Sequence, residues 1–298
     1  MSWISYLCCK YSFDLISKLY TMKRFLYLFL FCCIAVISYA GTPVKILAIG
    51  NSFSEDAIEQ NLNELASAAG YSTIIGNLYI PGCSLERHYD NAARNIGDYR
   101  YRKIGVDNVT VETNKVALET AIGDEKWDYI SLQQASHFSG LWNTYEPYLH
   151  ELVTYIHKLA PQAKIVWHQT WAYAQNSDHS GFKNYAGSQK QMYDEIMKCS
   201  QRAVNEEGFD IIVPNGTAIQ NARTSFIGDN MNRDGYHLNL VYGRYTAACT
   251  WFEAIFKKSV VGNSYAPKVM SRELIRAAQT AAHNAVSNPY SVTEEKRK

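Results

Sequence analysis

Two short segments of the chain carry residue types that can form a nucleophilic relay. Residues 50–54 read Gly-Asn-Ser-Phe-Ser, and residues 233–237 read Arg-Asp-Gly-Tyr-His. A serine hydroxyl becomes a nucleophile when a histidine accepts its proton, and that histidine needs a carboxylate to fix its tautomer. Asp234 and His237 are three residues apart, so a single turn can pair them. The pattern predicts acyl transfer with Ser52 as nucleophile, His237 as base and Asp234 as orienting carboxylate.

Each segment also has a simpler interpretation. Ser52 or Ser54 would be an ordinary N-cap of the helix that follows, and Asp234 with His237 would be a solvated turn or a surface metal pair. Because position 54 is serine, the Gly-x-Ser-x-Gly elbow of α/β-hydrolases is absent. The late position of the Asp-x-x-His segment, before a C-terminal helix, favours a relay that returns to the first strand.

Short apolar runs alternate with helical periodicity along the chain. This alternation predicts an α/β three-layer sandwich with about five parallel strands and helices on both faces. The predicted strands are 44–49, 72–80, 128–132, 164–169 and 210–213. The predicted helices are 57–69, 114–122, 145–159, 182–207, 240–256 and 272–286. In such a sheet, ligands bind beyond the carboxyl ends of the strands, which is where Ser52 would lie.

We expect one domain over residues 41–290, followed by a charged tail, 291–298. Residues 83–113 are polar and rich in tyrosine, and we predict an irregular insertion over the active site, with one short strand near 106–111.

The N-terminal 40 residues indicate export. A basic start at Met22 is followed by an apolar run over 25–37 and by Ser-Tyr-Ala at 38–40, the pattern of a cleaved signal peptide. Residues 1–21 would be an upstream extension. The predicted location is periplasmic or secreted, without a stable membrane span, and Cys32 and Cys33 do not indicate lipid attachment. Beyond the cleavage site remain three cysteines, which allow at most one disulfide: Cys83, Cys199 and Cys249.

Composition limits the partners. The net charge is +1 and no long basic or acidic block occurs, so the sequence gives no reason to expect nucleic acid as a partner. No His, Cys, Asp or Glu cluster has metal-ligand spacing, so we expect no metal and no cofactor. The expected partner is a small-molecule or glycan ester.

These motifs resemble the SGNH (GDSL-type) hydrolase superfamily, with Asn51 in place of the usual Asp. The segments Leu-Gln-Gln-x-Ser at 132–136 and Thr-Trp-Ala-Tyr-Ala at 170–174 are similar to a little-characterised branch frequent in gut Bacteroidetes. The resemblance implies a flavodoxin-like fold and an oxyanion hole formed by the N–H groups of Ser52 and Gly82. The usual third donor, an asparagine, is missing, so Gln133, or else Gln134, is its nearest substitute.

The sequence thus predicts an exported esterase for small acyl, above all acetyl, esters, with carbohydrate as the alcohol by analogy. Gln134, His137, Trp171 and Tyr173 follow the third and fourth strands, where they could line the substrate pocket. Three alternatives stay open: an acyltransferase on the same relay, a lipase or thioesterase, and a non-catalytic glycan-binding protein on the same scaffold.

Overall fold

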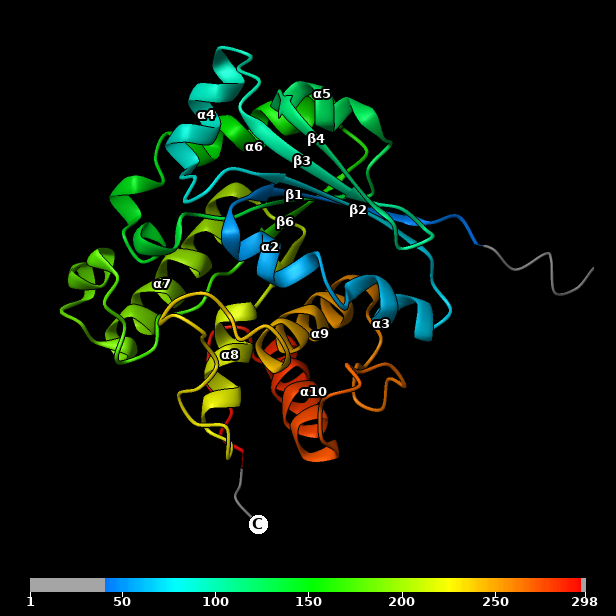
Figure 1. The fold of residues 1–298 in the computed structure, drawn as a ribbon. Coiled ribbons are helices and arrows are strands. Elements are labelled where there is room, and N and C mark those ends of the chain that lie inside the picture. Colours follow the sequence, from blue (N-terminus) through cyan, green and yellow to red (C-terminus); the bar gives the residue numbers. More distant parts are fainter. Residues whose placement is uncertain (1–40, 296–298) are drawn as a thin grey trace, which may run out of the picture. The chain divides into compact units, whose positions relative to one another are not determined.

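The computed structural model describes residues 41–295, and residues from Pro43 on form one unit around a seven-stranded sheet (Figure 1). The strand order is β4-β3-β2-β1-β5-β6-β7. Their bounds are β1 Val44–Gly50, β2 Thr73–Tyr79, β3 Tyr99–Ile104, β4 Thr110–Val116, β5 Tyr129–Leu132, β6 Lys164–His168 and β7 Ile211–Val213. The predicted signal peptide, Cys32 and Cys33 lie outside the described residues.

Five of these strands, β2-β1-β5-β6-β7, are parallel, which confirms the predicted sheet. Strand β1 lies inside it and is buried on both faces: Ile46 and Ala48 join one apolar cluster, while Leu47 and Ile49 join the other. This is why its sequence is continuously apolar from Ile46 to Ile49 and does not alternate with polar residues there.

Helices cover both faces of the sheet (Figure 1). On one side lie α4 (Leu85–Ala93), α5 (Leu118–Asp124) and α6 (Tyr148–Leu159). The other helices are α2 Ser52–Ile58, α3 Leu62–Ala68, α7 Gln189–Glu207, α8 Asn215–Arg223, α9 Tyr242–Phe256 and α10 Arg272–Ser287. Within residues 41–295, none of the helices is both long enough and apolar enough to cross a membrane.

Two predicted helices are broken in the structure. The stretch 57–69 belongs to two short helices, α2 and α3, because Asn61 adopts a left-handed backbone with φ of 68°. The stretch 182–207 is divided by Ala186 and Gly187, both with positive φ, into a 3₁₀ segment (Ser180–Tyr185) and α7. Helical periodicity continues across both breaks, so the sequence pattern alone did not show them.

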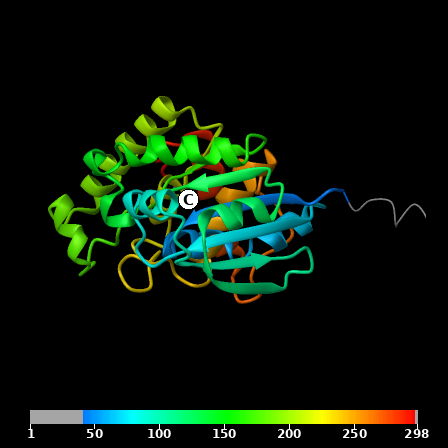
Figure 2. The same ribbon diagram turned by 90° about the horizontal axis from the view of Figure 1, so that it is seen from above.

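The prediction of an irregular insertion at 83–113 was wrong. This segment forms α4 and then the antiparallel strands β3 and β4, which extend the sheet beyond β2 at one edge (Figure 2). In β3, Tyr99 and Tyr101 are buried against the α4–α6 side, while Arg100 and Arg102 stack on the ring of Tyr79 on the opposite face. The polar composition concealed a regular alternation of tyrosine and arginine.

The three cysteines of the described region, Cys83, Cys199 and Cys249, are buried and free. Burial raises the pKa of each of these thiols, so none has the character of a reactive thiolate. Stability therefore comes from the core on the two sides of the sheet.

Two histidines are fully buried, and they make the fold sensitive to acid. Burial lowers the pKa of His88 to about 3 and that of His168 to about 3. Below pH ~6.5 these two histidines bind protons in the unfolded chain but stay neutral in the folded protein. Their contribution to the free energy of unfolding therefore falls as the pH falls. We expect a loss of about 1.4 kcal/mol for each histidine between about pH 7.5 and about pH 5.5.

Urea unfolding at the two pH values measures this loss. His88→Gln should remove about 1.4 kcal/mol of the pH dependence, whatever it does to stability at neutral pH, whereas the same change at the exposed His157 should leave the dependence intact. Equal pH dependence in the wild type and His88→Gln would show that His88 binds a proton as readily in the folded protein as in the unfolded chain.

Candidate functional site

The turn after β1 places Ser52 at the first position of α2. Gly50 permits the turn because a Cβ at this position would lie 2.5 Å from Ser54 Oγ. Asn51, and neither serine, caps the helix: its Oδ1 accepts from Phe53 N–H at 2.9 Å. The N–H of Ser52 has no partner within the helix, because the first N–H groups of any helix have none. The Ser52 side chain is only partly buried.

The turn after β2 is held beside this first turn. Asn51 Nδ2 donates to the carbonyl of Cys83 at 3.0 Å, so a single amide side chain contacts both turns. Gly82 is exposed and has a φ of +60°, which a residue with a side chain adopts only with strain. This bond joins the turn that contains Gly82 to the turn that leads into Ser52.

Asp234 and His237 pair on one tight turn. His237 Nδ1 lies 2.6 Å from Asp234 Oδ2, and Asp234 Oδ1 accepts from the backbone N–H of His237 at 2.8 Å. Partial burial raises the pKa of the Asp234 carboxyl, but the hydrogen bonds from His237 and from Tyr236 N–H outweigh it, so the net pKa is lowered. An ionised carboxylate thus accepts from Nδ1 and leaves Nε2 of His237 free to accept a proton.

The turn with His237 is bound to the helix that begins with Ser52. The carboxylate of Asp56, which is fully buried in α2, accepts from Leu238 N–H at 2.7 Å and from Arg233 Nη1 at 3.0 Å. The ring centroids of Phe53 and His237 are 6.2 Å apart. Ser52 directly precedes Phe53, so the hydroxyl and the imidazole come from segments in mutual contact.

Trp171 packs against the same contact between α2 and the turn with His237. It stacks on Phe53 with ring centroids 4.1 Å apart, and its Nε1 donates to Tyr236 O at 2.8 Å. Tyr173 bonds to Ser136 through its hydroxyl at 2.7 Å. Both rings are fully buried. They therefore support the site only through the residues that they contact, and neither ring can bind a ligand directly.

The two predicted glutamines are also buried and already bonded. Gln133 Nε2 donates to Asn51 Oδ1 at 2.9 Å, and its Oε1 lies 2.7 Å from His168 Nδ1. Because burial keeps His168 neutral, Nδ1 carries the proton that Gln133 accepts. Gln134 accepts from Leu85 N–H at 3.0 Å and donates to Thr144 O at 2.9 Å. Gln133 therefore fixes Asn51, and Gln134 joins the loops that follow β2 and β5.

An aromatic rim next to His237 includes two residues that the sequence did not single out. Tyr236 lies 4.1 Å from His237 and 4.8 Å from His179, measured between ring centroids, and His137 lies 5.8 Å from His179. All are partly exposed. Tyr236 belongs to the Asp-x-x-His segment and could have been found there, whereas nothing in the sequence marks His179.

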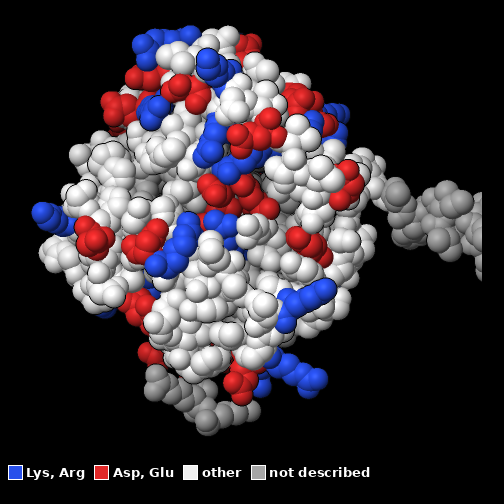
Figure 3. All heavy atoms as spheres, in the orientation of Figure 1, with Lys and Arg blue, Asp and Glu red and all other residues white. Residues whose placement is uncertain are grey.

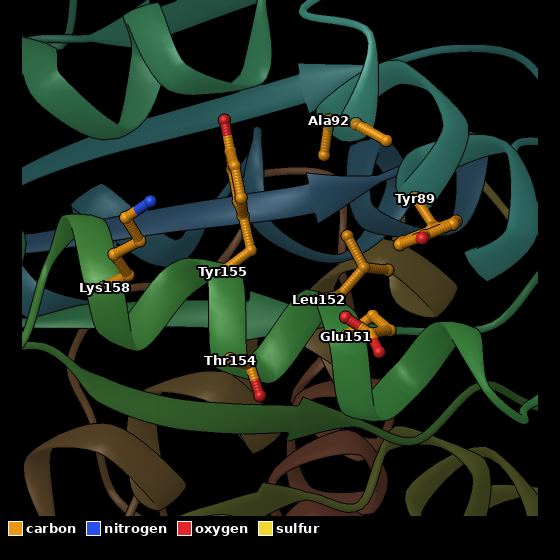
Figure 4. Close-up of a pocket in the computed structure, with 8 residues that line it drawn as sticks. Tyr89, Ala92, Glu151, Leu152, Thr154, Tyr155 and Lys158 are labelled. Atoms are coloured by element: carbon orange, nitrogen blue, oxygen red, sulfur yellow. The ribbon is translucent and has the colours of Figure 1, made fainter.

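A separate hollow of about 180 Å³ lies on the other side of the sheet, between α4 and α6 (Figure 4). It is lined by Tyr89, Leu152, Tyr155 and neighbouring side chains. Ser52, Asp234 and His237 do not line it. This hollow is therefore no part of the site at the strand ends.

Comparison with known proteins places the chain in a family. The family model described as "Domain of unknown function (DUF4886)" matches residues 45–285. The chain belongs to the DUF4886 family. A crystal structure of a DUF4886 protein from Bacteroides uniformis ATCC 8492 shares 54% identity and a TM-score of 0.84, covering 85% of this chain and 98% of that one. None of the curated proteins matches the sequence.

The DUF4886 fold is also that of a more distant structure. A protein from Parabacteroides merdae ATCC 43184, assigned as a GDSL-like lipase, is 17% identical with a TM-score of 0.50, covering 74% of this chain and 99% of that one. At this identity the likeness concerns the fold alone. It confirms the α/β architecture that the sequence predicted.

Proposed function

We propose that this DUF4886 protein is a serine esterase in which Ser52 is the nucleophile, His237 is the base and Asp234 orients His237. One observation carries the proposal: the paired Asp234 and His237 sit on a turn that Asp56 binds to the helix beginning with Ser52. A serine that only capped the helix would not need an Asp–His pair on an adjoining turn. Moreover, Asn51 already caps the helix, which leaves the Ser52 hydroxyl available for another role.

In the proposed reaction the Ser52 oxygen attacks the acyl carbon while His237 Nε2 takes the hydroxyl proton. The C–O bond to the alcohol then breaks, and the imidazolium returns the proton to the departing oxygen. Water attacks the acyl-enzyme with His237 again as base, the acid leaves, and Ser52 regains its proton. Asp234 stabilises the imidazolium in both halves of the cycle.

The N–H groups of Ser52 and Gly82 are the proposed oxyanion donors. Gln133 and Gln134, which the resemblance suggested as a third donor, are better explained as positioning residues, because both amides are buried and bonded elsewhere. Gln133 would act through Asn51, which it orients and which in turn holds the turns carrying Ser52 and Gly82. A donor held rigidly contributes most to transition-state stabilisation.

For the substrate we propose a small acyl ester, above all an acetyl ester, on carbohydrate. The partly exposed rings of Tyr236 and His179 support a sugar ligand, because aromatic faces pack well on sugar rings and polar edges bond to hydroxyls. The N-terminal pattern at residues 22–40 supports an exported protein, periplasmic or secreted, that meets such esters outside the cytoplasm.

Covalent labelling tests the nucleophile directly. A fluorophosphonate probe should add to Ser52, located by peptide mass spectrometry, because only an activated serine attacks phosphorus at neutral pH. The matched control is Ser271→Ala, which removes a true capping serine at the start of α10 and should not change labelling. A folded wild-type protein that stays unlabelled would leave a glycan-binding protein as the better interpretation.

A further inference from the structure

A cluster of arginines lies on the α2 side of β3, next to the proposed nucleophile. Arg102 pairs with Glu55 at 3.2 Å and with Glu59 at 2.9 Å. Arg244 pairs with Asp56 at 2.6 Å, and Arg233 with Asp56 at 3.0 Å. Figure 3 shows charged side chains of both signs gathered on the face that carries α2.

Arg100 differs from the other arginines of this cluster because it lacks a counterion. Its guanidinium lies over the ring of Tyr79, with Cζ 4.4 Å from the ring centroid, and is partly buried. Within residues 41–295 no carboxylate lies within 4.0 Å of it, although Arg102, two residues along the same strand, has two. A partly buried guanidinium held on an aromatic face and left without an anion suits an anionic ligand.

The sheet register places Arg100 beside the nucleophile turn. Gly50 in β1 is aligned with Tyr79 in β2, and Tyr79 is aligned with Arg100 in β3. Neighbouring strands are about 4.8 Å apart, so the backbone of Arg100 is about 10 Å from that of Gly50. Because β3 runs antiparallel, Arg100 lies nearer than Arg102 to the edge where β1 and β2 end.

The local charge also favours an anion. The three carboxylates of Glu55, Asp56 and Glu59 are already paired with Arg102, Arg233 and Arg244, so the charge of Arg100 is left over. Burial raises the pKa of Glu59 to about 7, although Arg102 and Asn77 oppose the shift. Part of the Glu59 population is therefore neutral near pH 7, which increases the positive excess around Arg100.

We propose that Arg100 forms a subsite for an anionic group, a carboxylate or a phosphate, on the alcohol part of the ester that Ser52 attacks. The proposal rests on the proposed function and adds the class of substrate. The acetyl group proposed as the acyl part is neutral, so the charge must belong to the alcohol. A sugar acid or a sugar phosphate has a ring that spans the gap, and a planar guanidinium binds either anion with two parallel hydrogen bonds.

Matched ester pairs test this subsite. Acetylated methyl galacturonoside is compared with its uncharged methyl ester, and acetylated glucose 6-phosphate with acetylated glucose. We expect the wild type to prefer at least one charged member, and Arg100→Gln to lower kcat/KM for that member by about 10- to 100-fold. The uncharged members should change by less than about two-fold. The preferred pair tells carboxylate from phosphate.

Two further variants exclude a general charge or folding effect. Arg94→Gln removes an exposed arginine at the end of α4, six residues before Arg100, and should leave both members of each pair unaffected. Arg100→Lys keeps the charge without the planar fork and should restore part of the preference. Equal losses on charged and uncharged esters in Arg100→Gln, or no preference in the wild type, would overturn the subsite.

Failure of the esterase proposal is distinguishable from failure of the subsite. If the wild type hydrolyses none of the esters, calorimetric binding of free galacturonate and glucose 6-phosphate is compared with binding of galactose and glucose. Tighter binding of a charged sugar that is lost in Arg100→Gln would support the subsite without the reaction. Equal or undetectable binding of all four sugars would refute it.

Discussion

Replacing Ser52 by alanine is expected to lower kcat for hydrolysis of p-nitrophenyl acetate by a factor of about 10³ to 10⁶, with the fold intact. The change removes the oxygen that is proposed to carry the acyl group. It should not disturb α2, because Asn51 supplies the cap and the Ser52 hydroxyl bonds to no other described side chain. Steady-state kinetics and circular dichroism measure the two effects.

The same relay predicts non-additive losses. His237→Ala should cost nearly as much as Ser52→Ala, and the double variant should be no slower than either single one, because each change disables the same proton transfer. Asp234→Asn keeps the turn but removes the negative charge next to Nδ1, and a loss near 10⁴ in kcat is expected. A Ser52→Ala protein with undiminished turnover would contradict the mechanism.

The pairing of Asp234 with His237 could be predicted because the two residues are close in sequence. Asp234 and His237 pair across three residues, and Ser52 follows a glycine at the end of a strongly apolar strand. That the turn with His237 lies against the helix that begins with Ser52 could only be inferred from the topology of a parallel sheet. The five parallel strands were predictable for a related reason: strands buried on both faces must be apolar, and that signal is strong even in short segments.

The features that could not be predicted, the burial of Asp56 and the role of Gln133, depend on contacts between residues that are distant in sequence. Asp56 looks like one of two acidic residues on an exposed helix turn, yet it is fully buried because Arg233 and Arg244, 177 and 188 residues further on, neutralise it. Gln133 was interpreted from its place at a strand end, but its role follows from Asn51 and His168, which lie on other strands or turns. No local pattern encodes such partners.

Asn51 shows how one departure from the resembled motif fits this protein. Its oxygen accepts from Phe53 N–H and from Gln133, while its nitrogen donates to the carbonyl of Cys83. An aspartate has no N–H to donate and would place negative charge against that carbonyl. In this chain, then, the amide is the side chain that the surrounding groups require.

Asp56→Asn is expected to destabilise the protein by about 3–5 kcal/mol, the cost of removing the carboxylate from the buried ion pair with Arg244. Asp56 is fully buried and accepts from Arg233, from Arg244 and from the N–H of Leu238. Asparagine has nearly the same shape, but its NH₂ would face donors. A loss of this size is a large part of the ~5–15 kcal/mol that stabilises an ordinary domain, and urea unfolding measures it.

Activity should fall in Asp56→Asn beyond the loss of folded protein, because Asp56 also binds the turn with His237 to the helix with Ser52. The rate is therefore expressed per folded molecule, using the folded fraction from the unfolding curve. Glu55→Gln is the matched control: Glu55 is the adjacent acid, its side chain is 27% exposed, and its partners Arg102 and Arg244 each pair with a second carboxylate. Because both guanidinium groups keep a carboxylate, this change should cost less than Asp56→Asn. If Asp56→Asn were as stable as Glu55→Gln and equally active per folded molecule, the buried carboxylate would not be what brings the histidine to the serine.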